Sequence, residues 1–383
     1  MYKKNPVFLA AYLGMLLFGI SLITLGSVAT DLKTRFSLDG IASGTLFSIL
    51  PFGILAGSFL FGPICDRYGY KLLLIFSCMG MFAGFEGIAF ASSLGILKLC
   101  IFIFGLGGGI INGATNAVVA DISTKNKGAN LSLLGVFFCI GALGMPLLLG
   151  VLAHMFNSFE VIAAVGWLTL AVGLLYIFIQ FPRAKQQQGI TITKWDNLFN
   201  SLLLLIAFFL FCQSSLEAIV NNWTTTFLIT RSTMMESNAL YALSLHIVGM
   251  TVMRLLTGSV FRNVLPAKMM WIGLILLLIG FILLQIGTTA GLAISGLILT
   301  GAGLAEGFPI MLGYVGEKFA ALSATAFSFV FVVALIGNML INYLMGLIVH
   351  HYGVEHLTTV SFAETGIMML LFFFIFQKVK SKK

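Results

Sequence analysis

Residues 95–121 read GILKLCIFIFGLGGGIINGATNAVVAD, and residues 291–317, which lie 196 positions further on, read GLAISGLILTGAGLAEGFPIMLGYVGE. Both stretches are apolar, carry glycine at their first, eleventh and thirteenth positions, and end on an acid. Eight glycine pairs share this offset, whereas about two are expected by chance. A hydrophobic chain built from two copies of one unit is typical of a membrane transporter with internal repeats. The pairs outside the two stretches are Gly53/Gly249, Gly62/Gly258, Gly84/Gly280, Gly141/Gly337 and Gly150/Gly346.

The composition supports an integral membrane protein. Of 383 residues, 59% are hydrophobic and only 9% are charged, which is more apolar surface than a soluble protein of this length could bury. We expect an all-α protein of twelve transmembrane helices in two pseudo-symmetric six-helix halves, because the apolar runs are too long for barrel strands. The predicted spans are 7–30, 41–62, 72–91, 97–121, 129–153, 160–181, 198–225, 239–261, 269–289, 290–316, 323–349 and 358–377.

The predicted domains are an N-terminal six-helix bundle (1–181), a cytoplasmic linker (182–197) and a C-terminal six-helix bundle (198–383). If the N-terminus lies inside, most Lys and Arg residues fall on the cytoplasmic side, and the outside keeps only Lys33, Arg35, Lys98 and Arg231. We therefore expect both termini in the cytoplasm and the chain in the plasma (bacterial inner) membrane. The net charge of +8 then reflects topology and contact with anionic lipid headgroups, not nucleic-acid binding.

The loop after the second span carries a motif. It reads Gly62-Pro-Ile-Cys-Asp66-Arg67-Tyr-Gly69-Tyr-Lys71, and its glycine, acid, base, glycine, base spacing resembles the signature of the major facilitator superfamily. The resemblance implies a tight cytoplasmic turn whose charges latch the two halves together. The alternative is a basic loop that simply obeys the positive-inside rule. The predicted latch residues are Gly62, Asp66, Arg67, Gly69 and Lys71, with Arg254 and an acid such as Glu317 in the second half, where Arg262 replaces Asp66.

A narrower resemblance covers spans four, five, seven and ten. Residues 105–121, residues 130–146, Glu217 to Trp223 and Glu306 to Pro309 are similar to the fucose permease-like group of sugar transporters, which are typically proton symporters. The resemblance implies that spans one, four, seven and ten line a central cavity. Fucose permease itself has a proton-linked acid four positions before the asparagine that matches Asn116. Here that position is Asn112, so this proton site does not transfer.

Four acids in the apolar spans are candidates to replace it: Glu86, Glu217, Glu306 and Glu364. A carboxyl group in a poorly solvated cavity readily binds and releases a proton near neutral pH. We expect Glu306 to carry the proton, with Glu217 as second choice. The alternatives are a structural acid for Glu306 and an acid at the outer interface for Glu217. Glu86 and Glu364 lie on peripheral spans and are interpreted as packing residues.

A polar set fits a hydroxyl-rich ligand, because amides and carboxylates donate and accept hydrogen bonds while an aromatic ring stacks on a sugar. We expect Asn112, Gln213 and Glu306 to approach one level of the bilayer. Span amides also bind neighbouring helices, which is the favoured interpretation for Asn338 and Asn342, and Trp223 equally suits an interface belt. The substrate-binding candidates are Asn112, Asn116, Gln213, Glu217, Asn221, Asn222, Trp223 and Glu306.

Some residues suit conformational or relay roles. Pro51, Pro146 and Pro309 are predicted kinks that give their helices two arrangements. His246 could relay protons or simply pack between helices.

The function predicted from these patterns is secondary active transport, most simply proton-coupled symport of a monosaccharide by alternating access, in a monomer. One alternative is a proton-coupled exporter of drugs or lipid-like amphiphiles, and another is a transport-incompetent sensor or membrane scaffold. No nucleophile with its base, no metal cluster and no cofactor fingerprint occurs in the sequence. We therefore expect neither an enzyme nor a cofactor.

Overall fold

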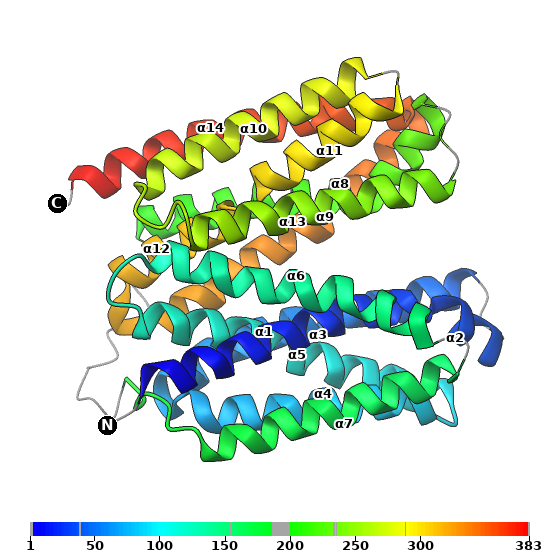
Figure 1. Ribbon diagram of the computed structural model, residues 1–383, viewed down its shortest axis with the longest axis vertical. Coiled ribbons are helices and arrows are strands. Elements are labelled where there is room, and N and C mark those ends of the chain that lie inside the picture. Colours follow the sequence, from blue (N-terminus) through cyan, green and yellow to red (C-terminus); the bar gives the residue numbers. More distant parts are fainter. Residues whose placement is uncertain are drawn as a thin grey trace. The chain divides into compact units, whose positions relative to one another are not determined.

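The structure is a computed structural model that describes residues 3–37, 40–152, 155–185, 200–232, 234, 236–287 and 289–381. Among these residues every regular element is a helix, and twelve spans are long and apolar enough to cross a membrane (Figure 1). The predicted all-α architecture is confirmed. The first half contains α1 (Lys4–Ser27), α2 (Ala29–Arg35), α3 (Gly40–Tyr68), α4 (Tyr70–Phe90), α5 (Leu94–Ile122), α6 (Lys127–Leu152) and α7 (Ser158–Phe178). The second half contains α8 (Ser201–Ser232), α9 (Glu236–Gly258), α10 (Pro266–Ile286), α11 (Ala290–Leu304), α12 (Gly307–Lys318), η3 (Ala320–Leu322), α13 (Ser323–Tyr352), η4 (Val354–His356) and α14 (Leu357–Ser381).

The chain forms two compact units that exchange short segments. Unit 1 comprises Met1–Thr124, Leu134–Thr193 and Phe319–Phe329, and unit 2 comprises Lys125–Leu133, Lys194–Lys318 and Val330–Lys383. The start of α6 therefore belongs to unit 2, and the start of α13 belongs to unit 1. Most of the linker predicted at 182–197 lies outside the described residues, and the domain boundaries stay a prediction.

The repeat read from the sequence recurs in the packing. In unit 1, Gly53 of α3 lies against the carbonyl of Phe102 on α5, and Gly105 of α5 lies against the carbonyl of Leu50 on α3. In unit 2 the residues 196 positions later make the same two contacts between α9 and α11: Gly249 with Ile298, and Gly301 with His246. A Cβ atom at any of these glycines would collide with backbone, so glycine is what lets each helix pair approach this closely.

The helix starts follow the same repeat. The Ser93 hydroxyl accepts the N–H of Ile96 at the start of α5, and the Thr289 hydroxyl, 196 positions later, accepts the N–H of Leu292 at the start of α11. A hydroxyl at this position satisfies a backbone donor that has no partner within the helix. The two caps start α5 and α11 at positions that are equivalent under the repeat.

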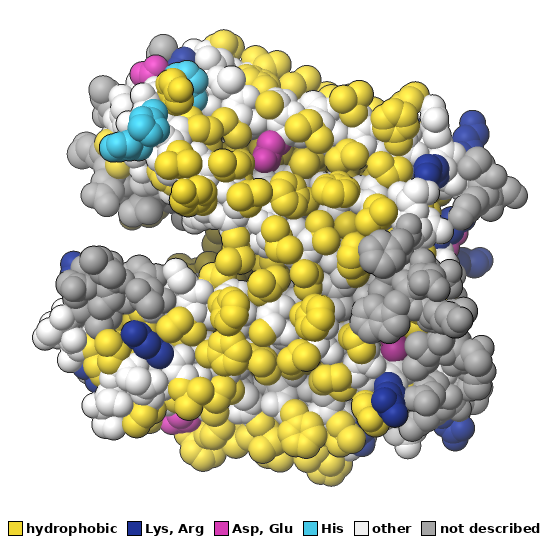
Figure 2. Space-filling view, turned by 180° about the vertical axis from the view of Figure 1, so that it is seen from behind, with side chains coloured by type: hydrophobic (Ala, Val, Ile, Leu, Met, Phe, Trp, Pro, Cys, Tyr) yellow, Lys and Arg dark blue, Asp and Glu magenta, His cyan; other side chains and the backbone are white. Residues whose placement is uncertain are grey.

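The surfaces of the units suit a lipid environment. Hydrophobic side chains cover the middle of each unit, while Lys and Arg side chains gather toward the helix ends (Figure 2). Many of these apolar side chains are largely exposed, for example Phe178 (86%) and Val151 (74%). Exposing so many of them to water together would be costly. The twelve apolar spans and this coat indicate an integral, multi-pass membrane protein.

The structure refines the predicted spans at three places. A short helix, α2, follows α1, and α8 continues to Ser232 instead of ending near residue 225. Span ten is split into α11 and α12. The helices α3 and α6 run through Pro51 and Pro146 without interruption, so of the three predicted kink prolines only Pro309 accompanies a broken helix.

Candidate substrate and proton site

The break in span ten lies at Ala305 and Glu306, between the end of α11 and the start of α12. Pro309 explains it, because proline has no N–H to donate to the carbonyl of Ala305 four residues earlier. The guanidinium of Arg254, from α9, takes that place: its Nε donates to the Ala305 carbonyl at 3.2 Å. Arg254 is 6% exposed, so the break holds a buried cation.

Gln213 of α8 bonds the carbonyl of Leu304, which precedes Ala305. Its Nε2 donates to the carbonyl of Leu304 at 2.8 Å and to Oε1 of Glu217 at 3.0 Å. Gly307 makes this contact possible, since a Cβ atom there would overlap the Gln213 amide. Gln213 and the segment carrying Glu306 thus meet in unit 2, and Glu217 lies one turn along α8 on the same face.

Glu306 is completely buried at the break. Its Oε1 accepts the hydroxyl of Ser132, from the start of α6, at 3.3 Å, and that hydroxyl also lies 3.1 Å from the carbonyl of Arg254. Thr257 of α9 lies close to the same carboxyl group. Among the described residues, neither Glu306 Oε2 nor the Thr257 hydroxyl has a hydrogen-bond partner. A charged carboxylate with a bare oxygen is costly in such a place, and a proton would remove that cost.

Asn112 and Asn116 lie in unit 1 and bond to one another. Asn116 is buried, and its Nδ2 donates to the carbonyl of Asn112 at 2.8 Å and to its side-chain oxygen at 3.1 Å. Asn112 is half-buried. The expected approach of Asn112 to Gln213 and Glu306, which lie in unit 2, stays a prediction.

The C-terminal part of α8 contacts α13 through amides. Asn222 Nδ2 donates to the side-chain oxygen of Asn342 at 3.0 Å, and Trp223 Nε1 donates to the same atom at 3.2 Å. Asn342 Nδ2 in turn donates to the carbonyl of Asn338 at 2.9 Å. Asn338 Nδ2 donates to the carbonyl of Ser214 on α8 at 3.3 Å, so both Asn338 and Asn342 join helices, in line with the favoured interpretation. Asn222 and Trp223 share this helix contact, and Asn221 is exposed beside them.

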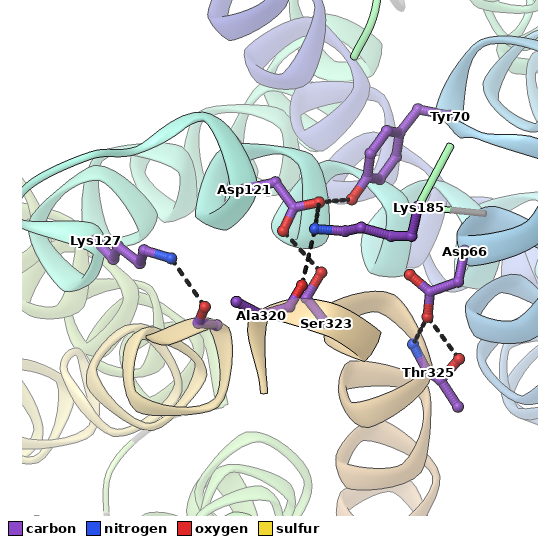
Figure 3. Close-up of polar contacts among 9 residues, drawn as sticks. Asp66, Tyr70, Asp121, Lys127, Lys185, Ala320, Ser323 and Thr325 are labelled. Carbon is purple, nitrogen blue, oxygen red and sulfur yellow. Dashed lines mark hydrogen bonds and ion pairs between the residues drawn. The ribbon is translucent and has the colours of Figure 1, made fainter. Parts of the chain in front are cut away.

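Asp66 caps the start of α13 in unit 1. It is 2% exposed, and its Oδ2 accepts the N–H of Thr325 at 2.9 Å and the Thr325 hydroxyl at 2.6 Å (Figure 3). A carboxylate at a helix N-terminus satisfies unpaired donors and complements the helix dipole. A contact between the first and second halves of the sequence therefore forms at the predicted latch residue.

The other latch residues of this loop have distinct places. A Cβ atom at Gly62 would lie 2.6 Å from Cβ of Ser328, so Gly62 lets α3 approach the start of α13. Gly69 has a φ of +89°, a conformation that favours glycine, where α3 turns into α4. Lys71 donates to the carbonyl of Ile177 at 2.6 Å, within unit 1, and Arg67 is exposed over the ring of Tyr68.

The second-half counterpart of this loop makes an equivalent contact with a different charge. Arg262, at the position equivalent to Asp66, donates to the side-chain oxygen of Asn130 at the start of α6 at 2.7 Å. Glu317, the suggested partner of Arg254, is exposed. Arg254 instead lies at the break in span ten, because Pro309 leaves a carbonyl there without a helical donor.

A second polar cluster in unit 1 surrounds Asp121, the acid that ends the first quoted stretch. Its Oδ2 accepts the Tyr70 hydroxyl at 2.6 Å and lies 3.0 Å from Nζ of Lys185 (Figure 3). Its Oδ1 accepts the Ser323 hydroxyl at 2.7 Å, and Lys185 also donates to the carbonyl of Ala320 at 2.9 Å. The sequence marks Asp121 only as the equivalent of Glu317, so this tie to the start of α13 was missed.

Three further titratable side chains in the spans are those of His246, Glu86 and Glu364. His246 Nδ1 is 3.2 Å from the hydroxyl of Thr300 on α11 and belongs to the α9–α11 contact. Glu86 Oε1 and Glu364 Oε2 are buried without a hydrogen-bond partner among the described residues. A Cβ atom at Gly166 of α7 would lie 3.0 Å from the carboxyl group of Glu86, which therefore faces a helix packed against α4. Within the described part of the chain, no group of three or more His, Cys, Asp or Glu residues could hold a metal ion.

Comparison with known protein families shows which family this chain belongs to. The sequence model of the Major Facilitator Superfamily matches residues 11–321. The chain belongs to the major facilitator superfamily. The resemblance of the Gly62–Lys71 loop to the signature of this superfamily is thereby confirmed at the level of the family.

Relatives of this chain have names that describe different substrates. The putative niacin/nicotinamide transporter NiaP of Bacillus subtilis (strain 168) is 26% identical over 198 residues, which are 49% of this chain and 47% of that protein. The multidrug resistance protein MdtG of Proteus mirabilis (strain HI4320) is 30% identical over 183 residues, which are 46% of this chain and 45% of that protein. The chain spans about half the length of the curated relatives it matches.

Two solved structures share the fold. The proton:xylose symporter XylE aligns with a TM-score of 0.82 at 15% identity and covers 97% of this chain and 95% of its own. The transporter FucP in the outward conformation aligns with a TM-score of 0.80 at 16% identity, over 96% of this chain and 98% of its own. Identities this low establish the fold alone.

Proposed function

We propose that this member of the superfamily is a secondary active transporter that carries a monosaccharide together with a proton by alternating access. It would act in the plasma (bacterial inner) membrane with both termini in the cytoplasm, as a monomer and without enzymatic activity. The observation that carries the proposal is Glu306, a fully buried carboxyl group at a broken membrane helix with one oxygen unpartnered. The fold shared with XylE and FucP supports it.

In this proposal Glu306 alternates between carboxylate and carboxylic acid. The charged form is stabilised by the Ser132 hydroxyl and the nearby Arg254, and opposed by its burial. Protonation removes one of the two acidic charges that interact with Arg254, the other being that of Glu217, and so strengthens the attraction of the guanidinium for a substrate oxygen. Loading of proton and sugar would then support one another.

The residues proposed to bind the sugar offer both hydrogen-bond donors and acceptors. In unit 2, Gln213 and Glu217 form an amide–carboxyl pair that offers donors and acceptors to hydroxyl groups. In unit 1, Asn112 is half-buried and keeps its own amide N–H groups for a ligand, since in its bonds with Asn116 it acts as the acceptor. Asn221, Asn222 and Trp223 are proposed for the outer end of the path.

The latch contacts would control access. Asp66 with Thr325, and Asp121 with Ser323 and Lys185, tie the start of α13 to helices of the first half. Opening of the protein at the start of α13 would require these bonds to break. Because the bonds are buried and charge-assisted, breaking them would be costly.

The direct test is uptake of a panel of labelled monosaccharides into proteoliposomes, with and without an inward proton gradient. We expect one sugar to accumulate only with the gradient, and a protonophore to abolish the accumulation. Absence of flux for every sugar would contradict the sugar proposal.

Glu306→Gln tests the assignment of the proton. The amide cannot titrate but keeps the shape of the side chain, so gradient-driven accumulation should be lost while counterflow exchange continues. Glu86→Gln is the matched control, because Glu86 is also an acid within a span but lies against α7. Accumulation retained by Glu306→Gln would refute the role of Glu306.

A second candidate function is export of drugs or lipid-like amphiphiles by proton exchange. The similarity to MdtG, over about half of each chain, is the observation that favours it. Extrusion of hydrophobic dyes by cells expressing the protein, together with no sugar uptake, would support this function in place of symport.

A further inference from the structure

Two serines make equivalent hydrogen bonds in the two units. In unit 2 the Ser132 hydroxyl donates to the carbonyl of Arg254 at 3.1 Å, and in unit 1 the Ser328 hydroxyl donates to the carbonyl of Ser58. Ser132 and Ser328 are 196 positions apart, and so are Ser58 and Arg254. Each bond joins the early part of a helix in one half of the sequence to the second span of the other half. The repeat therefore places one such contact in each unit.

A glycine lies beside each of the two serine contacts. Gly62 faces Ala324 and Ser328, and its equivalent Gly258 lies against Ala129 and Leu133, which are on the same stretch of α6 as Ser132. The absence of a side chain brings the two helices of each pair close enough for a seryl hydroxyl to reach a helix carbonyl. A carbonyl inside a helix already accepts one bond, so each serine adds a second.

The two contacts differ in the second acceptor that lies within reach of the seryl hydroxyl. Ser328 has as its other acceptor the carbonyl of Phe59 at 3.0 Å, a neutral group. Ser132 has Oε1 of Glu306 at 3.3 Å. A hydroxyl has a single proton to donate, and a bond to a carboxylate is about twice as strong as a bond to a neutral oxygen. The strength of the Ser132 contact therefore depends on the charge of Glu306, whereas that of the Ser328 contact does not.

We propose that Ser132 is the positioning residue through which a proton on Glu306 loosens the start of α6 from the second half of the chain. This inference rests on the proposed function, in which Glu306 carries the proton. When Glu306 is charged, the Ser132 hydroxyl is drawn to the carboxylate and α6 is bound to α9 and the break in span ten. When Glu306 is neutral, the Ser132 hydroxyl keeps only the weaker bond to the Arg254 carbonyl, so α6 is held less tightly at this point and separation becomes easier.

Other charged groups lie near this contact. At the start of α6, Arg262 donates to Asn130 at 2.7 Å and Lys127 donates to the carbonyl of Gly316 at 2.8 Å, and neither bond involves Glu306. From α9, Arg254 faces the carboxyl group of Glu306, and Thr257 adds a neutral hydroxyl. From α8, the facing side chain is Gln213, with Glu217 behind it. From α10, Gly273 lies 4.0 Å from Cβ of Glu306 and adds no charge. The carboxyl groups near this contact are those of Glu306 and Glu217, and Glu217→Gln separates their effects.

The test measures separation directly, with spin labels at Lys125 and Leu265 in the full-length protein with its native cysteines replaced. Both residues are exposed and lie in unit 2, near the start of α6 and the end of the α9–α10 loop. Distances between the labels are recorded from pH 5 to pH 9 without sugar. We expect the longer distance to gain population at low pH in the parent protein and in Glu217→Gln, and to predominate at every pH in Glu306→Gln.

Ser132→Ala should flatten this response, so that the ratio of the two populations changes less than about twofold over the range, because the carboxylate then has no hydroxyl of α6 to hold. Ser132→Thr keeps a hydroxyl and should restore the response. Ser328→Ala is the matched control and should keep the response of the parent protein.

An equal pH response in Ser132→Ala and the parent protein would overturn the role of Ser132 while leaving Glu306 as the proton carrier. A parent protein whose distances do not change with pH would instead overturn the proton coupling proposed for Glu306, and with it this inference.

Discussion

The position of the Gln213 amide depends on the missing side chain of Gly307. Its Nε2 bonds both the Leu304 carbonyl and Glu217, and it does so in space left by the missing side chain of Gly307. The amide is the flexible end of a long side chain, so an added methyl group would displace it without moving any backbone.

Gly307→Ala should therefore leave the fold intact but remove both hydrogen bonds of Gln213, at a cost of about 1–3 kcal/mol in stability. Thermal unfolding of the purified protein measures this cost, and Gly366→Ala, where a Cβ atom meets nothing within 4 Å, is the control. The double variant Gly307→Ala with Gln213→Ala should cost less than the sum of the two single changes. Strict additivity would show that the two residues are independent.

At the scale of single residues, the sequence allowed some of the site to be predicted. Glu306, Gln213 and Glu217 were identifiable because polar side chains in apolar spans are costly and few. Ser132 and Thr257 were missed, since hydroxyl residues are common in membrane helices and bond to their own helix. For Ser132 a signal did exist: its equivalent, Ser328, lies at the repeat offset. The partner of Arg254 depended on a carbonyl freed by Pro309, which residue spacing alone does not show.

Among the helices, the split of span ten into α11 and α12 has the clearest local cause. Pro309 removes one donor, and the freed Ala305 carbonyl is bonded by Arg254. Ala305 itself keeps a right-handed helical conformation, with φ −58° and ψ −37°. The backbone is thus ready to continue as a helix if a donor is supplied.

Pro309→Ala supplies that donor. We expect stability to stay the same or rise by about 1 kcal/mol, while the initial rate of gradient-driven transport falls several-fold because Arg254 loses its carbonyl and the break stiffens. Pro146→Ala, in the uninterrupted helix α6, is the control and should change the transport rate little. Thermal unfolding and initial uptake rates measure the two effects, and an undiminished rate in Pro309→Ala would contradict a working role for the break.

Helix existence was easier to predict than helix ends. Long apolar runs identify spans by themselves, whereas the start of α2 and the end of α8 at Ser232 were not predicted from those runs. Pro51, Pro146 and Pro309 look alike in the sequence. What distinguishes Pro309 is the buried guanidinium of Arg254, which bonds the carbonyl that the proline frees.

For the molecule as a whole, residues that lie 196 positions apart share packing contacts as well as residue type. Gly105 and Gly301 meet a backbone carbonyl at equivalent places, whereas Gly95 and Gly291, the second residues of α5 and α11, meet nothing within 4 Å. Backbone cannot move aside as a side chain can, so the two kinds of glycine pair should respond differently to the same change.

Gly105→Ala and Gly301→Ala should each destabilise the protein by about 3 kcal/mol or more, through overpacking of α3 on α5 and of α9 on α11. Gly95→Ala and Gly291→Ala should be neutral or stabilising by up to about 1 kcal/mol, because alanine restricts the unfolded chain. Thermal unfolding of the four variants gives the comparison. Unequal responses within a pair would show that the two halves have diverged in packing despite their shared sequence pattern.

The exchange of segments between the units bears on how such a chain could have arisen. Residues 125–133 and 321–329 are equivalent under the repeat, and each belongs to the unit formed mainly by the other half. A six-span chain without its repeat would leave this segment uncovered, and a second copy of the same chain could cover it by lending its own. Fusion of two genes encoding such a swapped pair would produce the reciprocal exchange seen in this protein.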